Sequence, residues 1–448
     1  MVKNKNKLKV WIVTVNMGYG HMRAAFPLKH MAHKGIIIAN DYPGIPKKDK
    51  KTWLDQRKFY EAISRFKKVP IAGNAVFGFF NLFQKIPKFY PKRDLSRPNL
   101  QVLSTIYMAK RKDWGKHLIN KLAKTPLAFV TPFFATAFMA EVNNYPNDIF
   151  CIICDADMSR TWAALNPAKS RIKYLAPNQR VVDRLKLYGV PEKNIFLTGF
   201  PLPIEILGKE SCDTAKLDLA QRLINLDPDR KYISKYKKTL VSSLKIKSFP
   251  KKSDHLLTLT FAVGGAGAQR ELGGNIVKGL AKLIRNKEIR INLIAGVHKE
   301  VNTYFKKVIK QNKLSEHLGK EVRILYTDNK KDYFKEFNKW IRTTDVLWTK
   351  PSELVFYSGL GLPIIIAPPI GSQEFFNQKY LINLGAGINQ EDIRYVDEWL
   401  VDWIKSGRLA EAAAQGYLEA PNLGTYNIEK VLSKHIHKLK KIKTISPY

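Results

Sequence analysis

Cysteine is scarce in this sequence: Cys151, Cys154 and Cys212 are its only three among 448 residues. Three cysteines are too few for a disulfide framework, so we expect the protein to work in a reducing compartment. Cys151 and Cys154 have the spacing of a redox pair, but they lie in an apolar run, where this offset directs two side chains to opposite faces of a strand. Because no second pair is present to complete a zinc site, we interpret both as core residues.

Acidic residues are also few, with 38 Asp and Glu against 76 Lys and Arg, which gives a net charge of +38. The excess is spread along the chain and favours an anionic partner: nucleic acid, an anionic membrane surface or phosphorylated substrates. A generally lysine-rich composition explains part of this excess equally well, and the charge alone does not distinguish among these partners. Since no recognisable nucleic-acid-binding motif accompanies the charge, we expect no specific nucleic acid partner.

Long apolar runs are absent, and no uninterrupted segment of the sequence could span a bilayer. The N-terminal MVKNKNKLKVWIVTV starts with basic residues, but its short apolar run leads directly into glycines, so it predicts a first strand instead of a signal peptide. With 45% hydrophobic residues the chain can still bury full cores. We therefore expect a cytoplasmic protein that reaches a membrane only peripherally, at its cytoplasmic face.

Short apolar runs alternate with helical patterns through most of the chain. This alternation is typical of α/β proteins with doubly wound parallel sheets. The runs fall into two series, which predicts two Rossmann-like domains. The first series comprises 10–15, 35–40, 127–131, 149–157, 172–177 and 194–199, and the second comprises 256–265, 289–297, 322–327, 345–349 and 362–368.

Changes in composition indicate the domain boundaries. Residues 1–203 form the N-terminal domain, 204–255 are polar and predict a helical connector or insertion, and 256–424 form the C-terminal domain. Residues 425–448 predict a basic helix with one apolar stripe, which we expect to pack back on the N-terminal domain. A membrane-surface role of that helix is a secondary interpretation.

Residues 70–93 combine aromatic side chains with a basic flank. Such a cluster is typical of a segment that inserts into the interface of an anionic bilayer. A helix buried in the first domain would have the same apolar pattern, so both interpretations stay open. The candidate membrane-interface residues are Phe77, Phe79, Phe80, Phe83, Lys85 and Lys88.

Two glycine-rich turns each follow a predicted strand. Such turns let the backbone approach a phosphate, and the start of the following helix adds partial positive charge. They also form plain connections, so each is weak evidence alone. The first turn holds Gly18 and Gly20 with His21 directly after them, and the second holds Gly264, Gly265 and Gly267 before a helix expected to begin near residue 268 or 269.

The stretch 345–388 carries a stronger pattern. A strand ends at Thr349-Lys350, and Pro351 then pre-sets a helix start with Ser352 and Glu353 in its first turn. GLGLP closes that helix and leads into the next strand. A loop with Gln373 and Glu374 follows, before Asn377 on a new helix. Both loops follow carboxyl ends of predicted strands, where open α/β sheets bind ligands.

These motifs resemble the donor-site signature of GT-B glycosyltransferases of family 28. That family includes the monogalactosyldiacylglycerol synthases and the N-acetylglucosaminyltransferase that forms peptidoglycan lipid II. The resemblance covers roughly residues 8–203 and 256–424. In the first domain, GYGH falls where the family has a glycine-rich loop ending in histidine, and Asp155 and Trp162 keep the family's order. The matches in the second domain are Thr349-Lys350, Gly361 to Pro363, Gln373-Glu374, Asn377 and Gly385 to Gly387.

The sequence departs from the family pattern after the Thr-Lys pair. Family members have a further glycine-rich turn there, and a later glutamate that grips the nucleotide ribose. This chain has Pro351-Ser352 instead, and its Glu353 comes too early to be that glutamate. The resemblance therefore leaves the base of the nucleotide open.

The resemblance implies a GT-B architecture, with two domains that face each other across a cleft. It also implies an inverting, metal-independent transfer of a sugar from a nucleotide diphosphate sugar, with a UDP-sugar as the favoured donor, to a lipid or membrane-associated acceptor. No cofactor is expected, because the nucleotide sugar is a co-substrate. The implied sites are Gly18 and Gly20 for the acceptor, Gly264, Gly265, Gly267, Lys350 and Ser352 for the donor diphosphate, and Gln373, Glu374 and Asn377 for the donor sugar.

Such a transfer needs a base to deprotonate the acceptor hydroxyl. His21 is one candidate, because a histidine can be tuned to titrate near neutrality, and Asp155 is the other. Holding a headgroup phosphate is an equally good interpretation of His21. Asp155 and Asp157 also form an Asp-x-Asp pair, with which GT-A glycosyltransferases bind a divalent metal, but the GT-B motifs on both sides favour a metal-free site.

Two other functions remain as alternatives. Nucleotide-sugar 2-epimerases share the GT-B architecture and act without an acceptor. A basic nucleic-acid-binding protein is the less favoured alternative, since only the charge indicates it.

Overall fold

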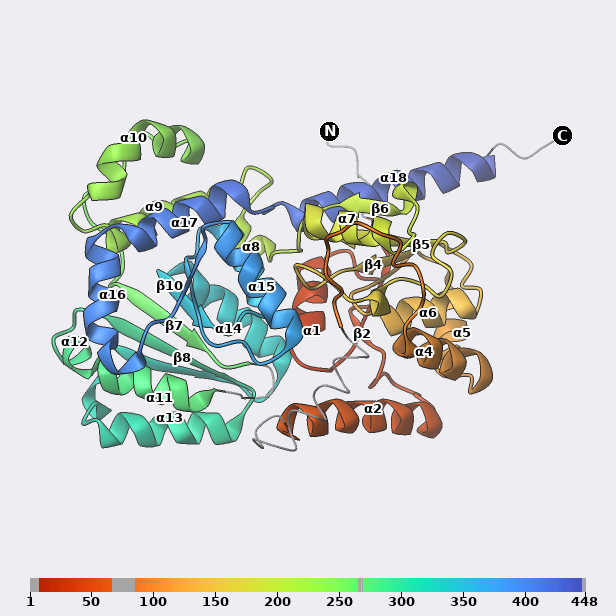
Figure 1. Ribbon diagram of the computed structural model, residues 1–448, viewed down its shortest axis with the longest axis horizontal. Coiled ribbons are helices and arrows are strands. Elements are labelled where there is room, and N and C mark those ends of the chain that lie inside the picture. Colours follow the sequence, from red (N-terminus) through yellow and green to blue (C-terminus); the bar gives the residue numbers. More distant parts are fainter. Residues whose placement is uncertain (1–7, 67–84, 265–266, 268, 445–448) are drawn as a thin grey trace. The chain divides into compact units, whose positions relative to one another are not determined.

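The computed structural model describes residues 8–66, 85–264, 267 and 269–444 (Figure 1). The chain divides into two compact units: unit 1 is Met1–Pro201 with Leu423–Tyr448, and unit 2 is Leu202–Asn422. Each unit holds one six-stranded sheet, and every strand pairing in both sheets is parallel. The prediction of two doubly wound, Rossmann-like sheets is therefore confirmed.

Some sequence predictions lie outside the described residues. They concern Phe77, Phe79, Phe80 and Phe83 of the membrane-interface segment, and Gly265 of the second glycine-rich turn. Lys85 and Lys88 are described, and both are exposed. Within the described part of the chain, no helix combines the length and the apolar character needed to cross a membrane.

The sheet of unit 1 has the strand order β2-β1-β3-β4-β5-β6. The chain therefore moves outward from β1 to β2 and then returns to β3 on the other side of β1. This reversal between β1 and β3 is the topological switch point, where open α/β sheets bind ligands beyond the carboxyl ends of their strands. The strands are β1 Trp11–Thr14, β2 Ile37–Ile38, β3 Phe129–Thr131, β4 Ile149–Ile152, β5 Ile172–Ala176 and β6 Ile195–Leu197.

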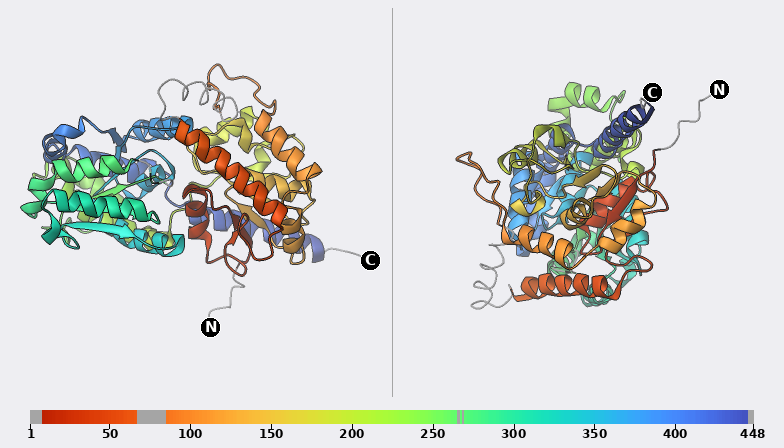
Figure 2. Two further views of the ribbon diagram at one scale, coloured as in Figure 1. Left: turned by 90° about the horizontal axis from the view of Figure 1, so that it is seen from below. Right: turned by 90° about the vertical axis from the view of Figure 1, so that its right-hand side faces the viewer.

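Helices flank this sheet, as right-handed crossovers between parallel strands require (Figure 2). The helices of unit 1 are α1 Gly20–Ala25, η1 Phe26–Leu28, α2 Lys47–Phe66, α4 Leu100–Arg111, α5 Lys116–Ala123, α6 Phe134–Val142, η2 Arg160–Trp162, α7 Gln179–Leu187, η3 Glu192–Asn194 and α18 Gly424–Thr444. The C-terminal helix α18 belongs to unit 1, where the ring of His435 packs edge-on against Phe150 and Phe196.

The sheet of unit 2 has the order β12-β11-β10-β7-β8-β9, so its switch point lies between β7 and β10. The strands are β7 Thr258–Ala262, β8 Arg290–Gly296, β9 Val322–Tyr326, β10 Val346–Thr349, β11 Ile364–Ile366 and β12 Gly387–Asn389. The helices are α8 Ile204–Leu207, α9 Asp213–Leu226, α10 Lys231–Leu244, α11 Arg270–Gly279, α12 Ala281–Arg285, α13 Lys299–Gln311, η4 Ser315–His317, α14 Lys330–Arg342, η5 Glu353–Leu360, α15 Ser372–Asn383, η6 Ile393–Tyr395, α16 Val396–Lys405 and α17 Arg408–Glu419.

Eleven of the twelve strands in the described part of the chain coincide with apolar runs in the sequence, and β12 is the exception. This strand has three residues and starts with glycine, so it carries neither alternation nor an apolar run. It forms because Ile364 N donates to Ala386 O at 3.0 Å and Ile388 pairs with Ile365 of β11. Long-range pairing, and not local preference, therefore makes the sixth strand.

The polar stretch 204–255 is built into unit 2. Its helix α9 contributes Arg222, which is 1% exposed and donates to three backbone carbonyls. Arg222 Nε lies 2.7 Å from Thr344 O, and its Nη1 lies 3.1 Å from Leu360 O and 3.0 Å from Gly361 O. This side chain fixes α9 to the amino edge of the sheet, beside β10 and the end of η5.

A second polar cluster lies at the same edge of unit 2. The carboxylate of Asp345 is fully buried and accepts from His255 Nε2 at 3.1 Å, Asn225 Nδ2 at 2.9 Å and Thr258 N at 2.8 Å. His255 Nδ1 lies 2.6 Å from the exposed Asp254 carboxylate. Burial by itself lowers the pKa of His255, but the hydrogen bonds to Asp345 and Asp254 outweigh it and raise that pKa above its ordinary value.

This cluster predicts a pH dependence of stability. Because the folded-state pKa of His255 is raised, protonation of His255 stabilises the folded state. This contribution to the free energy of unfolding is complete below about pH 6.5 and is lost as the pH rises through the folded-state pKa. His255→Gln should therefore lower the melting temperature most in acid, with a difference from the wild type that shrinks as the pH rises. Thermal denaturation between about pH 5.5 and about pH 8.5 measures this. A difference in melting temperature between the wild type and His255→Gln that stays constant across that pH range would contradict the raised pKa of His255.

Candidate functional site

The carboxyl edge of the unit 2 sheet gathers the loops predicted to bind a donor. Strands β7, β10 and β11 lie side by side and end at Ala262, Thr349 and Ile366. Thr349 Oγ1 donates to Ala262 O at 3.1 Å, which ties the ends of β7 and β10 together at the switch point. Gly264 and Lys350 lie in the turns that follow β7 and β10, and Glu374 stands in the first turn of the helix that follows β11, so the tertiary fold brings residues from three motifs to one place.

Glycine at position 264 leaves room for the side chain of Lys350. A Cβ atom at this position would overlap Cε of Lys350, so a larger residue would displace the lysine from the place that it has here. Gly267 has a φ of +69° and its N donates to Gly264 O at 2.8 Å, which closes the turn after β7. The turn therefore places backbone atoms next to a lysine, as a site for an anion requires.

Lys350 forms an ion pair with Glu374, through Nζ and Oε1. Oε2 of Glu374 accepts from Ile370 N at 2.6 Å and from Gly371 N at 3.4 Å. Both side chains are mostly buried, with 18% and 12% of their surface exposed. The residues predicted to contact the diphosphate and the sugar therefore contact each other, and an anion bound at Lys350 would compete with Glu374 for its ammonium group.

Helix α15 starts earlier than the sequence predicts. It begins at Ser372, so Gln373 and Glu374 stand in its first turn and not in a loop. The carboxylate of Glu374 caps this helix start, where negative charge is favourable. Asn377 is 1% exposed and donates to Pro351 O at 3.2 Å, so it fastens α15 to the turn after β10. Contact of Asn377 with a sugar stays a prediction.

The turn after β10 also differs from the expected one. Pro351 and Ser352 lie outside the helix, and η5 is a 3₁₀ helix that begins at Glu353. Gly361 ends it with a φ of +71°, packed against Leu219 of α9. The contact of Ser352 with a diphosphate stays a prediction.

Two residues near this edge carry no motif in the sequence. Gln269, in the left-handed region just before α11, donates from Nε2 to Pro368 O at 2.9 Å and so ties the loop after β7 to the loop after β11. His298 precedes α13, and its Cγ lies 3.5 Å from where a Cβ of Gly267 would stand. Both are single polar residues at a helix start, and only strand order shows that they border the site.

At the switch point of unit 1, His21 joins the ends of β1 and β3. It lies in the first turn of α1, which begins at Gly20 just after the loop of Gly18, and its Nδ1 is 2.9 Å from Pro132 O beyond β3. Gly18 has a φ of +86° with open space where a Cβ would stand. The fold therefore places the predicted acceptor loop and candidate base at the ligand-binding edge of this sheet.

Aromatic rings surround His21. Phe133 lies edge-on at 4.7 Å between ring centroids, and Trp162 lies at 6.2 Å. Phe133 also packs against Trp53 of α2 at 6.1 Å, and Trp53 against Trp114 at 4.5 Å. All four aromatic side chains are at most 7% exposed. The two rings beside His21, those of Phe133 and Trp162, are therefore buried apolar surface.

The two aspartates after β4 have different environments. Asp155 is partly buried, three residues beyond the end of the strand. Asp157 is 4% exposed, and Arg184 binds both of its oxygens at 2.8 Å, from Nε and Nη2. Asp157 is therefore held by Arg184, and a metal-free site stays a prediction. Across the described residues, no three His, Cys, Asp or Glu side chains gather as a metal site.

The three cysteines are free thiols and are buried, as expected for core residues. Cys151 is 0% and Cys154 is 4% exposed. Burial raises the pKa of the Cys151 thiol, which disfavours the reactive thiolate.

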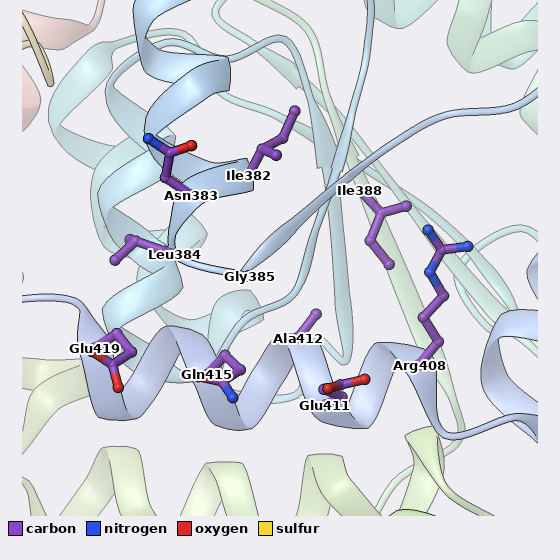
Figure 3. Close-up of a pocket in the computed structure, with 10 residues that line it drawn as sticks. All are labelled: Ile382, Asn383, Leu384, Gly385, Ile388, Arg408, Glu411, Ala412, Gln415 and Glu419. Carbon is purple, nitrogen blue, oxygen red and sulfur yellow. The ribbon is translucent and has the colours of Figure 1, made fainter.

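Figure 3 shows a cavity of about 550 Å³ in unit 2, between the end of α15, β12 and α17. Arg408, Glu411 and Gln415 of α17 line it together with Ile382 and Ile388. Parallel strands begin at one edge of a sheet and end at the other, and this cavity lies where β12 begins. It is therefore separate from the donor loops, and none of the predicted site residues lines it.

A family model described as a domain of unknown function, DUF6938, matches residues 248–320, less than half of the chain. No curated protein matches the chain. Among solved structures, the UDP-GlcNAc 2-epimerase of Neisseria meningitidis bound to UDP-GlcNAc is similar, with 13% identity, a TM-score of 0.47 and coverage of 95% of this chain and 100% of that one. MurG of Acinetobacter baumannii is similar too, with 12% identity, a TM-score of 0.47 and coverage of 95% and 99%. Such low values do not assign a function, which has to be argued from the site residues.

The pair of Lys350 and Glu374 predicts how an anion binds. Lys350→Met should weaken the binding of inorganic pyrophosphate by a factor of about 10 to 150, because a charge-assisted hydrogen bond is worth about 1.5–3 kcal/mol. Glu374→Gln should strengthen it, because the competing carboxylate is removed. Isothermal titration calorimetry measures both, with Lys379→Met, an exposed lysine on the same helix, as the matched control. Equal affinities in the wild type and Lys350→Met would exclude the site.

Proposed function

We propose that this protein is a glycosyltransferase that moves a sugar from a nucleotide diphosphate sugar, a UDP-sugar, to a lipid or membrane-associated acceptor. The observation that carries the proposal is the meeting of Gly264, Lys350 and Glu374 at the switch point of unit 2. Each comes from a different strand end, and together they offer backbone, a cation and a carboxylate at the edge where α/β sheets bind ligands.

The chemistry of these groups suits a nucleotide sugar. The Lys350 ammonium can neutralise charge on a diphosphate, both when the donor binds and when the nucleoside diphosphate departs. Glu374 can accept hydrogen bonds from sugar hydroxyls once the anion has replaced it at Lys350. The proposed mechanism needs no metal ion and no cofactor, because the lysine supplies the positive charge.

On the acceptor side, His21 is the proposed base, with Asp155 as the second candidate. The rings of Phe133 and Trp162 beside His21 favour this role over holding a headgroup phosphate, since a phosphate is poorly solvated against apolar rings. The same rings suit an acceptor with an apolar portion. Direct displacement of the nucleoside diphosphate by the activated hydroxyl would invert the anomeric centre.

Helix α4 supports a membrane-associated acceptor. One side of this helix is buried in unit 1, while Leu100, Leu103 and Tyr107 on the other side are 62%, 45% and 54% exposed. These three residues follow helical spacing and form one apolar stripe. The exposed basic residues Lys110, Arg111 and Lys112 stand at its C-terminal end. Apolar side chains next to cations suit the surface of an anionic membrane, which we propose is the cytoplasmic face.

Transfer itself is the test of the proposed function. The protein is incubated with a panel of UDP-sugars and a mixed extract of membrane lipids, and glycolipid products are followed by mass spectrometry. His21→Gln and Lys350→Met should each lower the rate by roughly 100-fold or more, as expected for loss of a general base and of charge stabilisation. A chelator should leave the wild-type rate unchanged.

Incubation with each UDP-sugar alone is the control. A transferase leaves the donor intact apart from slow hydrolysis, whereas conversion to the 2-epimer would establish the alternative reaction. If both variants keep the full activity of the wild type, whether it is transfer or epimerisation, the two sheet edges that hold His21 and Lys350 are not the active site.

The apolar stripe on α4 predicts membrane binding. Leu103→Glu/Tyr107→Glu should reduce co-sedimentation with vesicles of phosphatidylglycerol and phosphatidylcholine at least about tenfold, since each buried apolar side chain contributes about 1.5–3 kcal/mol. Leu217→Glu, which changes a leucine on α9 of unit 2 that is 60% exposed, is the matched control. Unchanged binding of the double variant would exclude α4 from the membrane contact.

A further inference from the structure

We infer that Thr131 and Thr136 are positioning residues that fix the tautomer of His21. They hold the Pro132 carbonyl so that the neutral imidazole carries its proton on Nδ1 and exchanges protons at Nε2. The tautomer follows from the geometry alone, and its catalytic consequence rests on the proposed function.

The two threonines form a closed ring of hydrogen bonds around Pro132. Phe133 N lies 3.2 Å from Thr131 Oγ1, the two hydroxyl oxygens lie 2.6 Å apart, and Thr136 Oγ1 lies 2.8 Å from Phe133 O. Both threonines are fully buried, so water does not compete for these groups.

The chemistry of the groups fixes the direction of each bond in this ring. A carbonyl only accepts, so the hydroxyl proton of Thr136 goes to Phe133 O. Thr136 Oγ1 then has no proton left for Thr131, so Thr131 donates to Thr136. Thr131 Oγ1 in turn accepts from Phe133 N. Each donor has one acceptor, and the turn at residues 131–133 is held in one arrangement.

This turn aims the carbonyl of Pro132 at His21. Pro132 has no N–H and a restricted φ, so the hydrogen bonds on either side of it set where its oxygen points. The oxygen lies 2.9 Å from His21 Nδ1 and 3.5 Å from Cys154 Sγ. Because a carbonyl cannot donate, Nδ1 of His21 must carry a proton. In the neutral ring the lone pair is then on Nε2.

The inference assigns the proton in the proposed transfer. Nε2 of His21 takes the proton of the acceptor hydroxyl, the hydroxyl oxygen forms a bond to the anomeric carbon, and the bond from that carbon to the diphosphate oxygen breaks. The nucleoside diphosphate leaves with the electron pair, and His21 becomes an imidazolium whose Nδ1 proton still faces Pro132 O. The carbonyl dipole favours this cation, although it is weaker than a carboxylate.

Magnetic resonance of the ring nitrogens of His21 tests the tautomer directly. The full chain is labelled with ¹⁵N in its nine histidines, and His21→Gln identifies the signals of His21. At about pH 8.5, about two units above the usual pKa of a histidine side chain, long-range ¹H–¹⁵N correlation should show Nδ1 protonated and Nε2 unprotonated. An Nε2–H tautomer in the wild type would overturn the inference, whether or not the protein transfers a sugar.

The threonine variants test the positioning role. Thr136→Val keeps the shape but removes the hydroxyl, so the population should shift toward the Nε2–H tautomer, and Thr136→Ser should restore the wild-type signals. Thr105→Val, another buried threonine of unit 1 that donates to Gln101 O at 2.7 Å, is the matched control and should change nothing. Thr131→Val provides a second test if Thr136→Val does not fold. Wild-type signals in a folded variant would refute the role of the ring.

Kinetics then separates this inference from the proposed function. With a working donor and acceptor, Thr136→Val should lower kcat about tenfold, leave the KM of the donor unchanged and alter the pH profile of kcat. If no donor and acceptor pair supports transfer while His21 is the Nδ1–H tautomer, the proposed function fails and the positioning of the ring stands.

Discussion

The arrangement of both candidate sites depends on parallel pairing between strands that are far apart in the sequence. In unit 2, β7 pairs with β10, so Ala262 stands beside Thr349 although 86 residues separate them in the chain. In unit 1, β1 pairs with β3, which brings Trp11 beside Phe129. Each pairing is the point where the strand order reverses, and helices of the crossovers leave the carboxyl ends open there. His21 at the start of α1 and Lys350 after β10 meet their partners only because of these two pairings.

The shortage of acidic residues is reflected in how this chain satisfies its buried cations. Arg222 donates to three backbone carbonyls, and the buried Arg160 donates to the carbonyls of Ser96, Ala163 and Ala164. Carbonyl oxygens can meet the donors of a guanidinium without bringing a second charge into the interior. Arg184 is an exception, because Asp157 binds it with both oxygens.

The sequence was sufficient to predict the elements that have strong local signals. Apolar runs predicted eleven strands, because a strand buried between two layers of helices needs continuous hydrophobic residues. Glycine-rich turns and strand ends also predicted that His21, Lys350 and Glu374 follow carboxyl ends. The short strand β12 escaped detection, since Gly387 to Asn389 extend only because β11 offers hydrogen-bond partners. The start of α15 was misplaced, because its cap is the carboxylate of Glu374 within the helix and not a residue before it.

The sequence by itself determined the fold class, the two series of strands and which residues follow each strand. Apolar periodicity and glycine placement are local properties, so they can be read without knowing the fold. Only the tertiary structure decided which of these residues meet: that Lys350 pairs with Glu374, that Asn377 is buried against Pro351, and that Thr131 and Thr136 orient the carbonyl facing His21. Such contacts depend on distances of a few ångströms between segments far apart in the chain, and strand order and packing set those distances.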